Sequence, residues 1–268
     1  MTPIQYARCL SGVVRREALR WVNQRGRFVS ALVRPLVWLA IFAAGFRFVL
    51  GLSITEPYDT YIPYEVYIAP GLVAMIQLFN GMQSSLSMVY DREMGSMRTL
   101  MVSPFPRWFL LLAKLLAGVA VGVVQAYIFL AIAWFWEIEP PLAGYALALP
   151  ALVLSGLMLG ALGLVLSSFV KQLENFAGVM NFVIFPMFFA SSGLYPLWRV
   201  KEGSLTLFWI CQFNPFTHAV ELIRFALYGQ FNALSAAVVT GFTLVFMALA
   251  VVGYDPGRGL IARRAAAE

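Results

Sequence analysis

Two stretches of this sequence carry polar or charged side chains in patterns that could bind a partner. The first is "YDREMGSMRTLMVSPFPR", residues 90–107, which lies between two long apolar runs. Asp91 is an adequate N-cap and Glu93 lies near the positive end of the helix dipole, so a short helix is expected to begin at Asp91 and to end at Pro104. Its methionines follow one another at helical spacing: Met94, Met97 and Met101. Such a stripe adapts to a partner groove, and a loop resting on lipid headgroups is the alternative.

The second pattern lies in the apolar run near residues 66–89. Its polar side chains recur at steps of three and four residues: Gln77, Asn80, Ser84 and Ser87. Amides that face lipid would lack hydrogen-bond partners, so this side of the helix must face protein or a water-accessible path. The sequence does not decide between these two roles for the stripe, helix packing and a substrate path. In a later run Asn181 and the helix-perturbing Pro186 raise the same alternatives.

Residues that catalysis or metal binding usually needs are scarce. His218 is the only histidine, and the two cysteines, Cys9 and Cys211, are expected on opposite sides of a bilayer, so neither a zinc site nor a disulfide is predicted. A phosphate-binding loop needs a Gly-Lys pair followed by Ser or Thr. Each lysine follows Ala or Val instead: Lys114, Lys171 and Lys201. We therefore expect no enzyme activity, no ATP site and no bound cofactor in this chain.

The composition indicates a membrane protein. Of the 268 residues, 61% are hydrophobic and 12% are charged, and the mean hydropathy is +0.79, so too few charges exist to cover a soluble domain. A bilayer core of roughly 30 Å needs about 20 apolar residues in a helix. Six apolar runs meet this need, near residues 33–53, 66–89, 109–135, 144–168, 175–195 and 232–253. The sequence predicts an all-α membrane protein whose transmembrane domain covers residues 31–253.

The distribution of charge predicts the orientation of these spans. Residues 1–30 hold six arginines and one acid, whereas the loops after the first and third runs hold acids and neither Lys nor Arg. By the positive-inside rule, residues 1–30, residues 90–107 and the tail, 254–268, lie in the cytoplasm, together with both termini. Because the arginines flank apolar runs, the chain's net charge of +6 reflects membrane topology, and no nucleic-acid partner is predicted.

Two segments fall outside the six spans. Residues 1–30 place apolar side chains at helical spacing opposite arginines, which predicts an interfacial helix on the inner leaflet. Residues 191–230 hold two short apolar pieces separated by Asn214–Pro215. Asn as N-cap and Pro at the first helical position begin the second piece, in which Glu221 and Arg224 can pair one turn apart. Since the chain enters and leaves on the outer side, a re-entrant helical segment is expected.

Over almost its full length this order of elements resembles the type-2 ABC transporter permeases, a family of drug, polysaccharide and lipid exporters. The most specific pieces are "YDREMGSMRTLMVSPFPR" and "FPMFFASSGLYPL" followed by "NPFTHAVELIR". The resemblance implies the type-2 exporter fold and a homodimer in the bacterial inner membrane. It also implies two copies of a separate ATPase subunit, which would bind ATP and Mg.

The resemblance implies roles for three sets of residues. Residues 91–104 would be the coupling helix that docks on the ATPase, through Asp91, Arg92, Glu93, Gly95, Ser96, Arg98 and Pro104. The substrate path between the two permease chains would be lined by Gln77, Asn80, Ser84 and Asn181. The outer segment, 191–230, would shape the exit through Ser192, Gly193, Pro196, Asn214, Pro215, Glu221 and Arg224.

Two other function classes stay open at this point. A secondary transporter or channel needs an ionisable group or a broken-helix ion site near the bilayer centre, but the acids here map to loops or interfaces. A membrane scaffold that acts on a partner complex has no residue signature against it. The polar stripe is compatible with a drug, a lipid or a glycan as substrate.

Overall fold

The computed structural model describes residues 3–23, 25–46, 56–58, 60–94, 104–170 and 172–254. The regular structure in these ranges is helical, which confirms the predicted all-α class. In chain order the helices are α1 (Pro3–Asn23), α2 (Arg25–Phe46), α3 (Tyr64–Glu93), α5 (Arg107–Ala133), η1 (Trp134–Trp136), α6 (Leu142–Phe169), α7 (Leu173–Phe189), α8 (Leu197–Gly203), α9 (Leu205–Phe213), α10 (Pro215–Leu227) and α11 (Ala233–Gly253).

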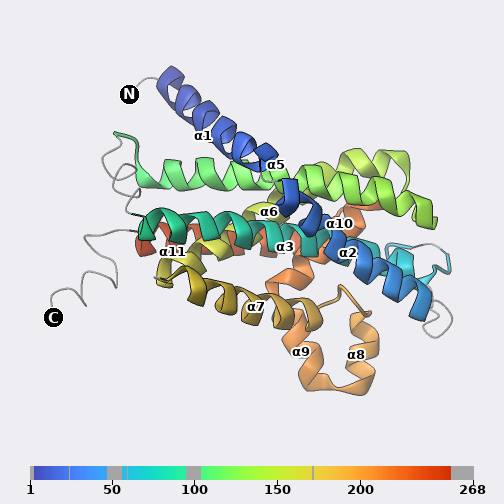
Figure 1. Ribbon diagram of the computed structural model, residues 1–268. Coiled ribbons are helices and arrows are strands. Elements are labelled where there is room, and N and C mark those ends of the chain that lie inside the picture. Colours follow the sequence, from blue (N-terminus) through green and yellow to red (C-terminus); the bar gives the residue numbers. More distant parts are fainter. Residues whose placement is uncertain are drawn as a thin grey trace.

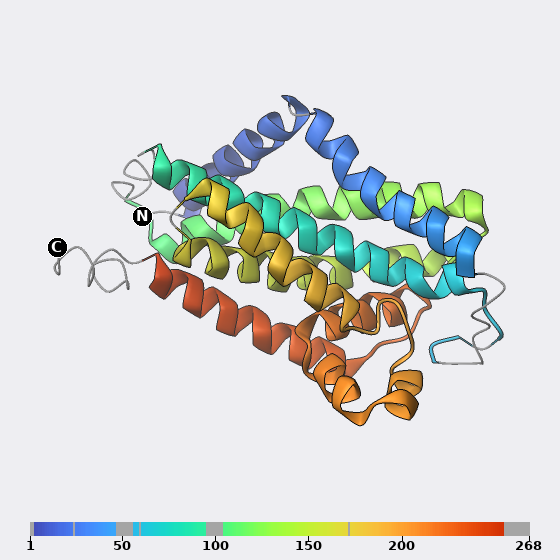
Figure 2. The same cartoon turned by 60° about the horizontal axis from the view of Figure 1, so that its bottom comes forward.

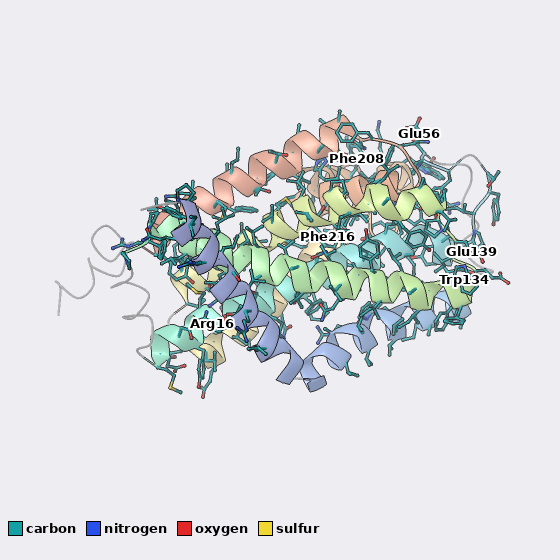
Figure 3. All side chains as sticks on the ribbon, turned by 90° about the horizontal axis from the view of Figure 1, so that it is seen from above. Arg16, Glu56, Trp134, Glu139, Phe208 and Phe216 are labelled. Atoms are coloured by element: carbon teal, nitrogen blue, oxygen red, sulfur yellow. The ribbon has the colours of Figure 1, made fainter. Side chains whose placement is uncertain are left out.

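Helix α3 lies at the centre of the bundle. It packs against α2, α5, α6, α7 and α10, and every residue from 67 to 79 is buried. Figure 1 shows the long helices side by side, and Figure 3, from above, shows α1 crossing α5. Residues 67–79 are apolar on nearly every side of the helix, which suits this covered position.

Three described helices are long and apolar enough to cross a membrane: Arg107–Trp136, Leu142–Phe169 and Ala233–Gly253. Two shorter apolar helices cover Ala31–Gly45 and Leu173–Phe189. Helix α3 has 30 residues but carries the polar stripe. The remaining spans of the six-span topology therefore stay a prediction.

The charge asymmetry of the sequence becomes an asymmetry of the folded bundle. In Figure 3, Glu56, Trp134 and Glu139 gather at one end, and Arg16 of α1 lies toward the other. The ends of α3 and α11 and the start of α5 lie together at one end of the bundle (Figure 1). This is the end opposite the acidic loops that Figure 3 labels.

Several expected boundaries differ from the structure. Helix α3 continues to Glu93, so Asp91 lies in its last turn, and the expectation that a separate helix begins at Asp91 is wrong. Helix α2 begins at Arg25, inside the range expected for the interfacial arm. The added helix, about one turn in α3 and about two turns in α2, keeps the backbone hydrogen-bonded next to the apolar run.

The fifth expected span also ends early, at Phe189, before residue 195. The side-chain amide of Asn214 donates to the carbonyls of Met187 and Ala190, at 2.7 and 2.6 Å, and so replaces the next helical hydrogen bonds. Other expected positions lie outside the described residues: 47–53 of the first span, Gly95, Ser96, Arg98 and residues 255–268.

Glycines allow close contact between α3, α5 and α6. A Cβ atom on Gly81 of α3 would lie 2.8 Å from the Cα of Gly160 of α6, and one on Gly118 of α5 would lie 2.8 Å from Ser84 Oγ. The small-xxx-small pairs Gly118/Gly122 of α5 and Gly156/Gly160 of α6 thus serve packing within one chain.

We expect Gly81→Ala to lower the thermal midpoint of the detergent-solubilised protein, because the new methyl group meets the backbone of α6. Overpacking of this kind costs about 1–3 kcal/mol, more than the roughly 1 kcal/mol that Ala gains over Gly in helix propensity. Gly241→Ala in α11, where nothing lies within 4 Å, is the matched control and should not lower the midpoint. Equal midpoints for the two variants would contradict the close contact.

Candidate functional site

The acidic residues at the end of α3 lie in two different surroundings. Asp91 is buried, and its Oδ2 lies 3.2 Å from the Nζ atom of Lys114 in α5, which is buried too. Glu93 is exposed at the last residue of α3, and Pro104 is exposed just before α5. The two helices therefore bracket residues 95–103, and Glu93 is available to a partner where Asp91 is not.

Sequence reasoning missed the role of Lys114. It tested this lysine only as part of a phosphate-binding loop. The signal that could have found it is a single cation inside a long apolar run, which must pair with an acid when it is buried. The partner, Asp91, is 23 residues away in sequence, so only the antiparallel packing of α3 and α5 reveals it.

The N-terminal arm lies against the same end of the bundle. The Tyr6 ring of α1 meets the rings of Phe105 and Phe109 edge to face, at centroid distances of 5.3 and 4.8 Å. Helix α1 thereby contacts the start of α5, close to where the chain returns from residues 95–103.

The polar stripe of α3 faces α5 and α6 of the same chain. Asn80 Nδ2 donates to the Gly118 carbonyl at 2.8 Å, and a Cβ on Gly122 would collide with the amides of Gln77 and Asn80. Together with Ser84 and Lys114, these side chains line a small void with room for about one water molecule. Of the two alternatives for the stripe, helix packing is the one that these contacts show.

Asn181 is not brought to this stripe. It lies on the exposed face of α7, next to Phe182, whose side chain is 80% exposed, and one turn before Phe185. The substrate-path residues proposed together are therefore divided between the interior of the bundle and an apolar outer face.

The outer segment is fastened to α3 by Arg224. This residue of α10 is 1% exposed and pairs with Glu221, which confirms the predicted pair. Its Nη2 donates to the Ser192 carbonyl at 2.8 Å, and its guanidinium lies 4.1 Å from the ring centre of Tyr67. Tyr67 also donates its hydroxyl to the Ser192 carbonyl, at 3.0 Å. One cation thus joins α10, α3 and the turn after α7.

Two tyrosines surround this cation without adding charge. Tyr58 packs on Tyr228 with ring centres 4.6 Å apart, and on Tyr67. Burial raises the pKa of the Tyr58 hydroxyl well above its usual value and that of Tyr228 to about 12. Both stay neutral at physiological pH, so Glu221 supplies the counter-charge of Arg224.

The positions of the other predicted residues of the outer segment explain why glycine, proline or asparagine occurs there. A Cβ on Gly71 of α3 would lie 2.7 Å from the Cα of Gly193, so the turn touches the helix backbone there. Pro196 is the N-cap of α8. Asn214 accepts from the Phe216 amide at 3.0 Å, and Pro215 holds the first helical position, which confirms the predicted start of α10.

The helical pair α8 and α9 projects from the bundle (Figure 2). A shallow hollow on α9 is lined by Thr206, Trp209, Ile210, Phe213 and Asn214. Arg199 lies over the Trp198 ring at 5.2 Å, and Lys201 lies over Phe208 at 5.6 Å. Aromatic rings beside basic groups are typical of a membrane interface. Within the described ranges, no cluster of three His, Cys, Asp or Glu residues could hold a metal ion.

Residues 9–228 match the family described as ABC-2 type transporter. The chain belongs to this family. The match covers most of the chain and includes the polar stripe, the connection between α3 and α5, and most of the outer segment. The resemblance to type-2 ABC permeases that the sequence motifs indicated is confirmed.

Named relatives of this ABC-2 family member are permeases and a nodulation protein. The chain is 32% identical to "Probable multidrug ABC transporter permease YbhR" of Escherichia coli (strain K12) over 176 residues, 65% of this chain and 46% of that protein. It is 23% identical to "Putative transport permease ycf38" of Porphyra purpurea over 222 residues, 81% and 72% of the two chains. It is 22% identical to "Nodulation protein J" of Rhizobium leguminosarum bv. viciae over 233 residues, which are 81% of this chain and 82% of that protein. The match to YbhR spans about half of that protein's length.

We expect Arg224→Met to loosen the outer segment, because it leaves Glu221 without its cation and the Ser192 carbonyl without a charged donor. Removing one partner of a buried pair costs about 3–5 kcal/mol. Limited proteolysis between residues 191 and 230 and the thermal midpoint measure the effect. Arg199→Met on the exposed face of α8 is the control. The fastening role is wrong if the two variants resist protease equally.

Proposed function

We propose that this ABC-2 family member is the membrane subunit of an exporter that moves its substrate outward across the bacterial inner membrane. A separate ATPase subunit, which binds ATP and Mg, would supply the energy. The family match over residues 9–228 carries this proposal. The name of YbhR as a probable multidrug ABC transporter permease supports it, with a drug as one candidate substrate.

The connection between α3 and α5 is our candidate for the ATPase contact. Its two helices meet at one end of the bundle, and α1 packs on the start of α5 there. The docking residues would be Arg92, Glu93, Gly95, Ser96, Arg98 and Pro104. Asp91 would act from inside the bundle through Lys114, since both side chains are buried.

A second copy of the chain would complete the substrate path. Helix α7 exposes Phe182 and Phe185, and α2 exposes Val37 and Ile41, so apolar surface is available on both. Asn181 lies on this surface of α7 and would face the path. Gln77, Asn80 and Ser84 contact the glycines of α5 and α6 in their own chain, so we propose Asn181 as the path residue and assign the other three to helix packing.

The mechanism follows from the position of α3. ATP binding would close the ATPase dimer and draw the two coupling segments together. A displacement of residues 95–103 would pass into α3, which contacts α2, α5, α6, α7 and α10. The permease pair would then alternate between inward-open and outward-open states, as bistable helix bundles do.

We expect Glu93→Arg/Arg98→Glu to reduce the ATPase that co-purifies with the permease by about tenfold or more, since charge reversal at an interface costs several kcal/mol. ATP turnover of the complex, with the permease and the ATPase co-expressed, should fall with it. Glu174→Arg, an exposed acid at the start of α7, is the control and should retain the ATPase. Wild-type complex formation by the double variant would refute the docking assignment, and a wild-type chain that binds no ATPase would refute the exporter.

A further inference from the structure

A buried ion pair links the last turn of α3 to α5. The Lys114 Nζ and Asp91 Oδ2 atoms are 3.2 Å apart, and the side chains are only 5% and 10% exposed. Asp91 lies two residues before α3 ends, and Lys114 lies about 10 Å along α5 from its start. The pair therefore joins the last turn of α3 to the first third of α5.

Charged side chains of α1 lie near this pair. Lys114 lines the small void beside Ser84 and Ser85, and both Glu17 and Arg16 of α1 act on it electrostatically, with opposite signs. Helices α1, α3 and α5 therefore meet around this group of charges. In so enclosed a place the attraction between the two charges is screened much less than at the surface.

The contact between α3 and α5 is also close at glycines. Gly118 of α5 lies against Ser84 of α3, and Gly122 lies against the amides of Gln77 and Asn80. Asn80 donates to the Gly118 carbonyl at 2.8 Å. A shift of one helical turn, about 5 Å, would break this hydrogen bond and separate the charges of the ion pair, so both resist sliding of one helix along the other.

A buried ion pair adds little to the stability of a fold compared with an apolar pair of similar volume. A well-packed apolar pair often stabilises as much or more, whereas charged pairs are well suited to fix register. The pair lies where α3 ends, which indicates that it controls the register of α3 against α5.

We propose that Lys114 is a positioning residue whose ion pair with Asp91 locks the register of α3 against α5. A displacement of residues 95–103 then moves both helices as one body and does not slide one along the other. This rests on the proposed function, in which that displacement comes from the ATPase.

The experiment measures the distance between α3 and α5 by double electron–electron resonance in the complex with the ATPase. Spin labels replace Tyr90 and Trp108, both exposed, in a background with Cys9→Ala and Cys211→Ala. The complex is compared without nucleotide and after trapping with ATP and vanadate. The variants are Asp91→Leu/Lys114→Met, which keeps the volume without the charges, and Asp91→Lys/Lys114→Glu, which reverses the pair.

In the wild type we expect one narrow distance that is the same in both states. The apolar pair should fold and retain the ATPase, but its distance should shift or broaden on trapping, whereas the reversed pair should keep the narrow distance. Gln125→Met, also buried in α5 but far from the connection, should behave as wild type. If the apolar pair does not fold, Asp91→Asn/Lys114→Gln takes its place.

The proposal is overturned if the uncharged pair keeps the wild-type distance after trapping, or if Gln125→Met broadens it equally. A purely structural role would alter the thermal midpoint and leave the trapped distance unchanged. Failure of the proposed function has a different signature, because it appears as a wild-type chain that retains no ATPase, before any variant is compared.

Discussion

Helix α3 is covered on all sides over residues 67–79, and this burial constrains the rest of the structure. A polar group on such a helix has neither water nor headgroups to face and must find its partner within the protein. Tyr67 bonds to the outer turn, Asn80 bonds to the backbone of α5, and Asp91 pairs with Lys114. The polar side chains of α3 therefore determine which elements lie beside it at each level.

The two ends of the bundle are held together by different charged groups. At the acidic end, Arg224 binds α10, α3 and the turn after α7 into one unit, from which only the pair α8 and α9 projects. At the other end, the Lys114–Asp91 pair joins α3 to α5 beneath residues 95–103. Between the two charged clusters, α3 meets glycines of α5 and α6, and Asn80 bonds to the Gly118 carbonyl. A helix that is tied to its neighbours at both ends and in the middle is suited to move as a unit with its attached elements.

The exposed apolar surface is not distributed at random. Large apolar side chains of α2 and α7 face outward, as do those of α11, of which only 11% is buried in its most apolar window. A membrane protein of the ABC-2 family can cover such faces with lipid or with a second copy. Because α3 is covered by its own chain, a path between two copies would be bounded first by α2 and α7.

The sequence by itself determined the family, the all-α class, most helix positions and the local geometry of the outer segment. These features are local: the length of an apolar run, the helix start at Asn214–Pro215, and the i, i+3 pair of Glu221 and Arg224. Each depends only on residues that are close together in the sequence. Only the tertiary structure decided that Asp91 faces Lys114, that Gln77 and Asn80 face glycines of α5, and that Asn181 faces outward. A helical stripe shows that one side is polar but not which neighbour covers it, because that depends on how distant helices pack.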